Sequence, residues 1–120
     1  CIDFGRKYNH FMFKFVTIYR QVDEPAAVDQ FFSETHLPMA EAMPNLLKTE
    51  VSWVKGKPGG SSRFYMMYEL YFESQEAWQM ALISEEGVAL MQALKPWGDQ
   101  KIVTWFYAET YEEEAGLEGG

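Results

Sequence analysis

The chain has 120 residues, a single cysteine and a formal net charge of -8 at pH 7. This length is typical of one domain, and one cysteine excludes a disulfide within the chain. The negative charge disfavours nucleic acid and anionic membrane surfaces as partners, because both would repel the protein. No apolar run approaches the roughly 18 residues of a membrane-spanning helix, and the cysteine content is typical of a cytoplasmic protein.

The two ends of the chain differ from the part between them. Residues 1–11 show no clear hydrophobic period, so we expect a leader or an expression remnant, with Met12 as the natural start. Residues 112–120 are rich in Glu and Gly and are predicted to be a solvated, disordered acidic tail. Residues 12–111 are therefore expected to form the one folded domain.

Four segments have the composition of β-strands, with many aromatic and β-branched residues. A loop rich in Gly, Pro and Ser at 56–62 separates the second segment from the third, which predicts an antiparallel hairpin. The predicted strands are 13–19, 46–54, 64–72 and 101–111.

The first helical segment lies between the first two strands. Asp23-Glu24-Pro25 is typical of a helix start, because Asp can cap and Pro is tolerated in the first turn. Pro38 is expected to end or kink this helix, since proline disrupts a helix interior. A shorter helical piece over 39–43 is expected to follow.

The second helical segment lies between the third and fourth strands. Ser74 is predicted to cap its first part, which buries Trp78. Ser84 is predicted to cap a second part, and Pro96 is expected to stop it.

The element order β-α-β-β-α-β predicts an α+β, ferredoxin-like fold. Two right-handed βα units give a four-stranded antiparallel sheet with both helices on one face. The other face should be polar in a monomer. In the strand 64–72, however, Met66 and Tyr68 alternate with Tyr65 and Met67, so both sides carry large apolar groups. We therefore expect a homodimer that packs sheet against sheet. The alternative is a monomer whose leader and tail cover that face.

Several short segments, in their order and spacing, resemble the EthD family. They are Phe13 to Arg20, Glu34-Thr35-His36-Leu37-Pro38, Pro44-Asn45-Leu46 and Ser84-Glu85-Glu86-Gly87, and they span most of Met12 to Tyr111. The resemblance implies a dimeric α+β barrel, in which two ferredoxin-like units pack their sheets together. The family is named for ethyl tert-butyl ether degradation, and relatives on the same fold include cofactor-free monooxygenases, muconolactone isomerases, polyketide cyclases and haem-degrading enzymes. Fold alone does not choose among these activities.

His36 is the candidate catalytic residue. It is the only histidine between residues 12 and 111, because His10 lies in the predicted leader. An imidazole that titrates near neutral pH can act as general acid or base, here towards a phenol or an enolisable ketone. The alternative is a structural imidazole that bonds the last free carbonyls of its helix.

The candidate ligand-binding residues are mostly aromatic side chains with one polar atom, which equally suit core packing. Glu69 is a lone acid in an apolar strand. It is expected to be buried and to partner His36, or else to lie exposed at an edge or pair with Arg20 or Lys101. The predicted ligand-binding residues are Tyr19, Tyr65, Tyr68, Glu69, Trp78 and Trp105.

No metal or other cofactor is predicted. One domain histidine and no domain cysteine give no ligand cluster, and haem would require His36 as its axial ligand. The loop at 56–60 joins two strands and is therefore a poor nucleotide site. We expect a pocket for a small hydrophobic or aromatic molecule, in a cofactor-independent oxygenase, isomerase or cyclase with His36 as acid or base. The alternative is a non-catalytic binding or accessory module in a catabolic or oxygenase pathway.

Overall fold

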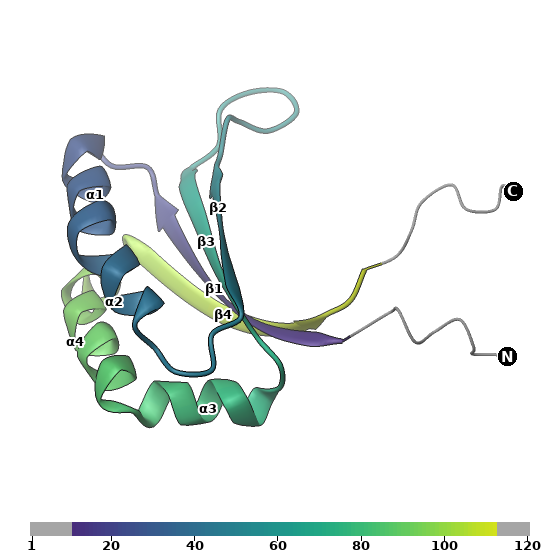
Figure 1. The fold of residues 1–120 in the computed structure, drawn as a ribbon. Coiled ribbons are helices and arrows are strands. Elements are labelled where there is room, and N and C mark those ends of the chain that lie inside the picture. The colour runs from purple at the N-terminus through teal and green to yellow at the C-terminus, as the bar shows by residue number, and fades with distance from the viewer. Residues whose placement is uncertain (1–10, 113–120) are drawn as a thin grey trace, which may run out of the picture.

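A computed structural model describes residues 11–112, which form one sheet with the helices on one side of it (Figure 1). The predicted leader, apart from Phe11, and the predicted tail, apart from Glu112, lie outside the described residues. Within the described part of the chain, no helix has the length and apolar character needed to cross a membrane. The predicted cytoplasmic location stays a prediction.

The sheet has four antiparallel strands in the order β2-β3-β1-β4. The central strands β1 (Met12–Arg20) and β3 (Phe64–Phe72) pair with each other, and β2 (Lys48–Trp53) and β4 (Val103–Thr110) form the edges. This order is what two βα units produce when their strands interleave. The predicted α+β, ferredoxin-like fold is confirmed.

The sequence predicted that Pro38 would end or kink the first helical segment, but the helical backbone continues through it. It runs from α1 (Pro25–Phe31) through the π-helix η2 (Phe32–His36) into α2 (Leu37–Glu41). The wide turn is closed by the Leu37 N–H bonding the Phe32 carbonyl. Pro38 therefore falls in the first turn of α2, where its missing N–H needs no acceptor.

The start of α1 also differs from the expectation. Glu24, not Asp23, is the N-cap residue, and its side chain makes no capping hydrogen bond. Pro25 occupies the first helical position, where its fixed φ angle suits a helix.

Both predicted serine caps of the second helical segment are confirmed. Ser74 Oγ accepts from the Ala77 N–H at 3.1 Å and begins α3 (Gln75–Ile83). Ser84 Oγ accepts from the Gly87 N–H at 3.1 Å and begins α4 (Glu85–Asp99). Each bond satisfies one of the N–H groups that a helix start leaves free.

The prediction that Pro96 stops the last helix is wrong, because α4 continues to Asp99. Proline removes one N–H from the helical ladder. The buried side chain of Leu94 and the core contacts of Trp97 nevertheless hold this turn against the sheet. The chain leaves the helix at Lys101, which adopts a φ of 62°.

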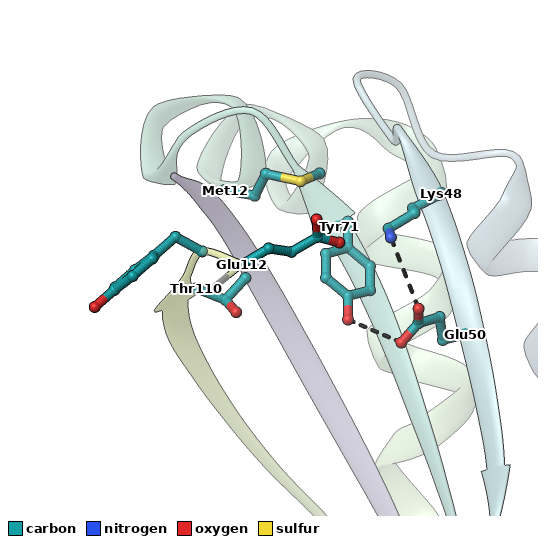
Figure 2. A pocket seen from close by; sticks show the side chains of 7 residues that line it. Met12, Lys48, Glu50, Tyr71, Thr110 and Glu112 are labelled. Atoms are coloured by element: carbon teal, nitrogen blue, oxygen red, sulfur yellow. Dashed lines mark hydrogen bonds and ion pairs between the residues drawn. The ribbon is translucent and has the colours of Figure 1, made fainter. Parts of the chain in front are cut away.

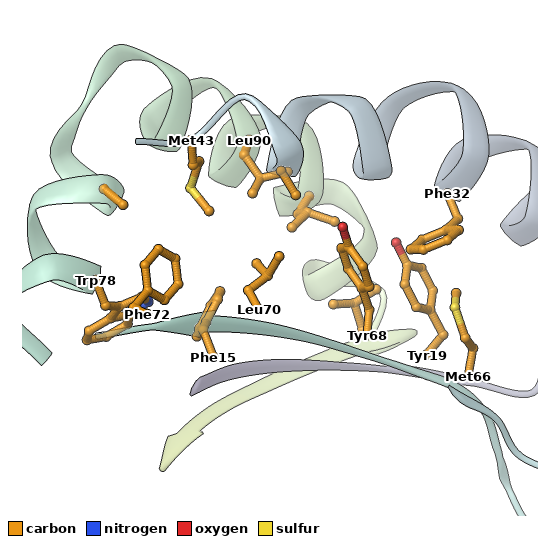
Figure 3. Close-up of a cluster of buried hydrophobic side chains, with 14 of the residues drawn as sticks. Phe15, Tyr19, Phe32, Met43, Met66, Tyr68, Leu70, Phe72, Trp78 and Leu90 are labelled. Atoms are coloured by element: carbon orange, nitrogen blue, oxygen red, sulfur yellow. The ribbon is translucent and has the colours of Figure 1, made fainter. Parts of the chain in front are cut away.

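The hydrophobic core lies between the helices and the sheet (Figure 3). Side chains at alternate positions of β1 and β3 point into it, because successive strand residues face opposite sides. Phe15 pairs with Leu70 in this layer, and Tyr19 pairs with Met66. Helix side chains such as Phe32 and Leu90 meet them from above (Figure 3).

The alternation in β3 is interrupted near its start. Tyr19 pairs with Met66 but Arg20 pairs with Phe64, so Tyr65 is an extra residue in the strand. Tyr65 Oη donates to Asp29 Oδ1 of α1 at 2.8 Å. Tyr65 thus contacts the helix layer. Strict alternation had placed Tyr65 and Met66 on opposite sides of the sheet, and for Tyr65 this expectation is wrong.

The opposite side of the sheet, here called the bare face, is covered by no helix of the described residues (Figure 1). It carries a mixture of apolar and charged side chains, so it is less uniformly apolar than the alternation suggested. Its residues include Val16, Ile18, Met67, Tyr71 and Phe106 together with Lys14, Lys48, Glu50 and Glu69.

Candidate functional site

His36 lies at the end of the π-helix and is completely buried against the sheet. Its Nδ1 is 2.5 Å from Tyr19 Oη of β1. The ring of Tyr68 stands almost perpendicular to the imidazole, with centroids 5.0 Å apart. Figure 3 shows Tyr19 and Tyr68 side by side, both pointing from the sheet towards the helices. Tertiary structure therefore brings together three predicted site residues from three separate elements.

Burial controls the protonation of this group. Desolvation lowers the pKa of His36 to about 3, so the imidazole is neutral at neutral pH. The expectation that His36 titrates near neutral pH is therefore wrong. Burial, followed by the effect of Tyr68, raises the pKa of Tyr19, and burial raises the pKa of Tyr68. All three groups are uncharged at neutral pH.

Four buried polar atoms near one another in the fold make no hydrogen bond among the described residues. They are His36 Nε2, Tyr68 Oη, Thr17 Oγ1 and Trp105 Nε1. Strand pairing sets Tyr68 beside Thr17 and Thr17 beside Trp105, so these three form a row across the helix-facing side of the sheet. We call His36, Tyr68, Thr17 and Trp105 the polar row. The side chain of Thr49 lies close enough to Tyr68 to offset part of the rise in the Tyr68 pKa, but the two side chains do not have the geometry of a hydrogen bond.

An unbonded polar row inside a core is unusual, because most buried polar atoms have a partner. Leaving such an atom unpaired costs about 1–3 kcal/mol. An atom of a bound water or ligand can remove that cost. The row is therefore the best candidate for a binding site on the helix-facing side.

The structural alternative for His36 was a bond to the carbonyls at a helix end. The chain continues as α2 beyond His36, and the hydrogen bond of its ring is to Tyr19. A π-helix turn such as η2 is frequently found at functional sites. Sequence reasoning missed the role of Thr17, although its place between Phe15 and Tyr19 on the buried side of a strand was a usable signal.

Trp78 does not join this group. Its ring packs 5.1 Å from Phe13, 5.5 Å from Phe15 and 4.7 Å from Tyr107, measured between ring centroids. Trp78 Nε1 makes no hydrogen bond among the described residues. Trp78 thus belongs to an aromatic cluster near the start of β1.

Glu69 lies on the bare face, so the sheet separates it from His36. Its Oε1 is 2.9 Å from Lys14 Nζ and accepts a hydrogen bond from Tyr71 Oη at 3.0 Å. The predicted partnership with His36 is wrong, and so are the pairings with Arg20 or Lys101. Tyr68 and Glu69 are neighbours in a strand and must face opposite sides.

A pocket of about 230 Å³ opens on the bare face near the ends of the strands (Figure 2). Tyr71 Oη donates to Glu50 Oε1 at 2.9 Å, and Lys48 Nζ lies 3.7 Å from Glu50 Oε2. Burial and the two carboxylates raise the pKa of Tyr71. The pocket is lined by Met12, Lys48, Glu50, Tyr71, Thr110, Tyr111 and Glu112.

A second pocket, of about 290 Å³, lies on the outer side of the helical segment that holds His36. Phe31, Thr35 and Trp97 are among its lining residues. The rings of Phe31 and Trp97 are 4.6 Å apart, and the Phe31 ring is 6.4 Å from His36. Phe31 therefore contacts both the pocket and the surroundings of the imidazole.

Metal binding finds no support in residues 11–112, where no group of three or more His, Cys, Asp or Glu side chains is arranged to hold an ion.

The chain is similar to known proteins in both sequence and structure. No family model matches the sequence. An ethyl tert-butyl ether degradation (EthD) family protein from Bacillus halodurans has a crystal structure with a TM-score of 0.76 and 31% identity, covering 86% of this chain and 99% of that one. An uncharacterised 11.0 kDa protein from the thcB–thcC intergenic region of Rhodococcus erythropolis is 28% identical over 76 residues, which are 63% of this chain and 74% of that protein.

Two more distant structures share the fold. SnoaB, a cofactor-independent oxygenase from Streptomyces nogalater, has a TM-score of 0.58 at 12% identity, covering 87% of this chain and 95% of that one. A dimeric ferredoxin-like protein of unknown function from Thermobifida fusca has a TM-score of 0.59 at 10% identity, covering 88% and 94%. At these identities the likeness extends to the fold alone.

Proposed function

Since the chain belongs to the EthD family, we propose that it binds a small hydrophobic molecule beside His36 and acts on it without a cofactor, using His36 as acid or base. The observation that carries this proposal is the unbonded Nε2 of His36 in the buried polar row. A buried site with several unpaired polar atoms is one that a ligand's polar atom can complete.

The protonation state of His36 limits the part that it can play. Because burial lowers its pKa to about 3, the neutral imidazole is a weak base at neutral pH, and it serves the ligand more readily as a donor to an oxygen atom within hydrogen-bond reach. Tyr19 fixes the orientation of the ring through Nδ1, which leaves Nε2 for the ligand. The cofactor-independent oxygenase SnoaB on the same fold supports, by analogy, chemistry that needs no prosthetic group.

We propose that the ligand enters past Phe31. The outer pocket and His36 are separated by this side chain, and η2 interrupts the regular helical hydrogen bonding at the same place. We therefore expect a ligand to reach the polar row by displacing the Phe31 ring.

The bare face supports the predicted homodimer. Phe106 remains 46% exposed there, and Ile18 and Met67 lie beside the same surface. Burying such side chains against a second copy is favourable by roughly 25 cal/mol per Å² of apolar area. We therefore propose that two chains pack bare face to bare face, as a dimeric α+β barrel.

The proposed activity can be tested before the natural substrate is known. The probe is 1-tetralone, an apolar ketone whose α-hydrogens exchange with D₂O when the carbonyl is enolised. We expect the wild-type protein to accelerate this exchange, measured by proton NMR, because a hydrogen bond from His36 to the ketone oxygen makes the α-hydrogen easier for a solvent water molecule to remove. His36→Gln should lose the acceleration. Tyr107→Phe, which alters a half-exposed tyrosine away from the polar row, is the matched control. Binding of 1-tetralone without any acceleration would instead support the non-catalytic binding module.

A further inference from the structure

We propose that the polar row takes a ligand through a carbonyl oxygen, which accepts hydrogen bonds from His36 Nε2–H and from the hydroxyls of Tyr68 and Thr17. This inference rests on the proposed function, since it names the chemical class of molecule that would occupy the same site. It assigns His36 the role of a hydrogen-bond donor, with the imidazole neutral.

The pairing of Tyr19 with His36 determines which imidazole nitrogen carries the proton. A phenol hydroxyl has one hydrogen to donate, whereas an unprotonated imidazole nitrogen can only accept. Among residues 11–112, Tyr19 Oη bonds His36 Nδ1 and no other atom. If Nδ1 carried the proton, the Tyr19 hydrogen would be left without an acceptor in the core. The bond is therefore Tyr19 O–H to Nδ1, and the proton of the neutral ring is on Nε2.

The other members of the row supply mostly donors. Trp105 Nε1–H can only donate, and the hydroxyls of Tyr68 and Thr17 can each donate one hydrogen. The nearby buried carboxylate, Glu69, is on the other side of the sheet. The complementary group on a ligand is therefore an oxygen that only accepts.

The polar row contains no cationic side chain, which further limits the class of ligand that it can bind. None of its four residues is a lysine or an arginine, so a carboxylate or phosphate ligand would be desolvated there without a counter-charge. A carbonyl oxygen accepts hydrogen bonds without carrying a net charge, so it avoids this cost. The walls are apolar, with Phe32, Met66 and Leu94 in the same core cluster, so the rest of the ligand is expected to be apolar.

The tautomer can be measured directly in the protein without a ligand. The chain has two histidines, His10 and His36, so ¹⁵N-histidine labelling gives one pair of ring-nitrogen signals for each, and His10→Gln assigns them. We expect His36 Nε2 to be protonated and Nδ1 to be unprotonated. A protonated Nδ1 with a bare Nε2 would overturn the inference, because His36 would then be an acceptor.

Ligand selectivity is tested with three probes of similar skeleton: 1-tetralone, tetralin and 1-naphthoate. We expect 1-tetralone to bind about ten-fold more tightly than tetralin, which lacks the oxygen, and to shift the His36 Nε2 signal. Tyr68→Phe and Thr17→Val should remove most of this preference. Tyr65→Phe, whose hydroxyl bonds Asp29 outside the row, should keep it.

The outcomes separate the two proposals. Equal binding of 1-tetralone and tetralin beside His36, or tighter binding of 1-naphthoate, would overturn the carbonyl inference and leave the hydrophobic site standing. Failure of every probe to perturb His36 or the amides of Thr17 and Tyr68 would overturn the proposed function as well.

Discussion

Tyr19 Oη and His36 Nδ1 lie 2.5 Å apart although the two residues are 17 positions apart in the chain. Tyr19 is on the central strand β1 and His36 is at the end of η2, so this bond joins the sheet to the helix layer inside the core. A buried hydrogen bond of this kind both orients the imidazole and avoids leaving Nδ1 unpaired.

The first prediction removes this bond. Tyr19→Phe keeps the ring but leaves His36 Nδ1 without a donor, which should lower the free energy of unfolding by about 1–3 kcal/mol. Urea denaturation of wild type and variant measures the change. The control is Tyr107→Phe, since Tyr107 is half-exposed, and its effect should stay within about 0.5 kcal/mol. Equal stability of Tyr19→Phe and wild type would show that the bond contributes nothing.

The second prediction concerns pH. The pKa of His36 falls from 6.5 to about 3 on burial, so between these values the unfolded state binds more protons than the folded state. Stability due to neutral His36 is therefore complete above pH 6.5 and is lost as the pH falls towards 3, by about 1.4 kcal/mol per unit. Denaturation at a series of pH values should show a steeper acid loss in wild type than in His36→Gln. Parallel curves would contradict a depressed pKa.

The third prediction concerns the junction of α3 and α4. A Cβ at Gly87 would clash with the backbone carbonyl of Ala81 and would lie 2.6 Å from the carbonyl oxygen of Leu82. Backbone atoms cannot move aside as a flexible side chain would, so Gly87→Ala should destabilise the fold by about 1–3 kcal/mol or more. Thermal denaturation checks this. At Gly60 a Cβ meets nothing within 4 Å, so Gly60→Ala should change stability little.

The fourth prediction tests the proposed dimer. Phe106 is 46% exposed on the bare face, and Phe106→Asp would place an unpaired charge in a sheet-to-sheet interface. Analytical ultracentrifugation at micromolar concentration should show a dimer for wild type and a 13.9 kDa monomer for the variant. Met80→Asp changes a 62% exposed residue of α3, away from that face, and should remain dimeric. A monomeric wild type would refute the dimer.

The element order and the two faces of each strand were largely predictable, because they depend on local periodicity. Strand residues alternate sides with period two, so the pattern from Met66 to Phe72 assigned its faces correctly. Ser74 and Ser84 were identified as caps because a serine before a helical run bonds N–H groups only three residues away.

The failures arose where tertiary contacts outweigh local preference. Pro38 and Pro96 both lie within helices, because a π-turn accommodates the first and packing of Leu94 and Trp97 holds the second. Tyr65 reaches α1 because one extra residue in β3 breaks the alternation. The deciding contacts are tertiary: Tyr65 bonds Asp29, 36 positions away in the chain, and Leu94 and Trp97 pack into the core that the whole fold creates.

Residue type and spacing were thus enough to predict the fold class and to single out His36 as the candidate catalytic residue between residues 12 and 111. They did not reveal that Tyr19 pairs with His36, that Glu69 is on the opposite face, or that Thr17, Tyr68 and Trp105 form one row. A binding site depends on which distant side chains become neighbours and on how far they are removed from water. Both are properties of the folded chain as a whole.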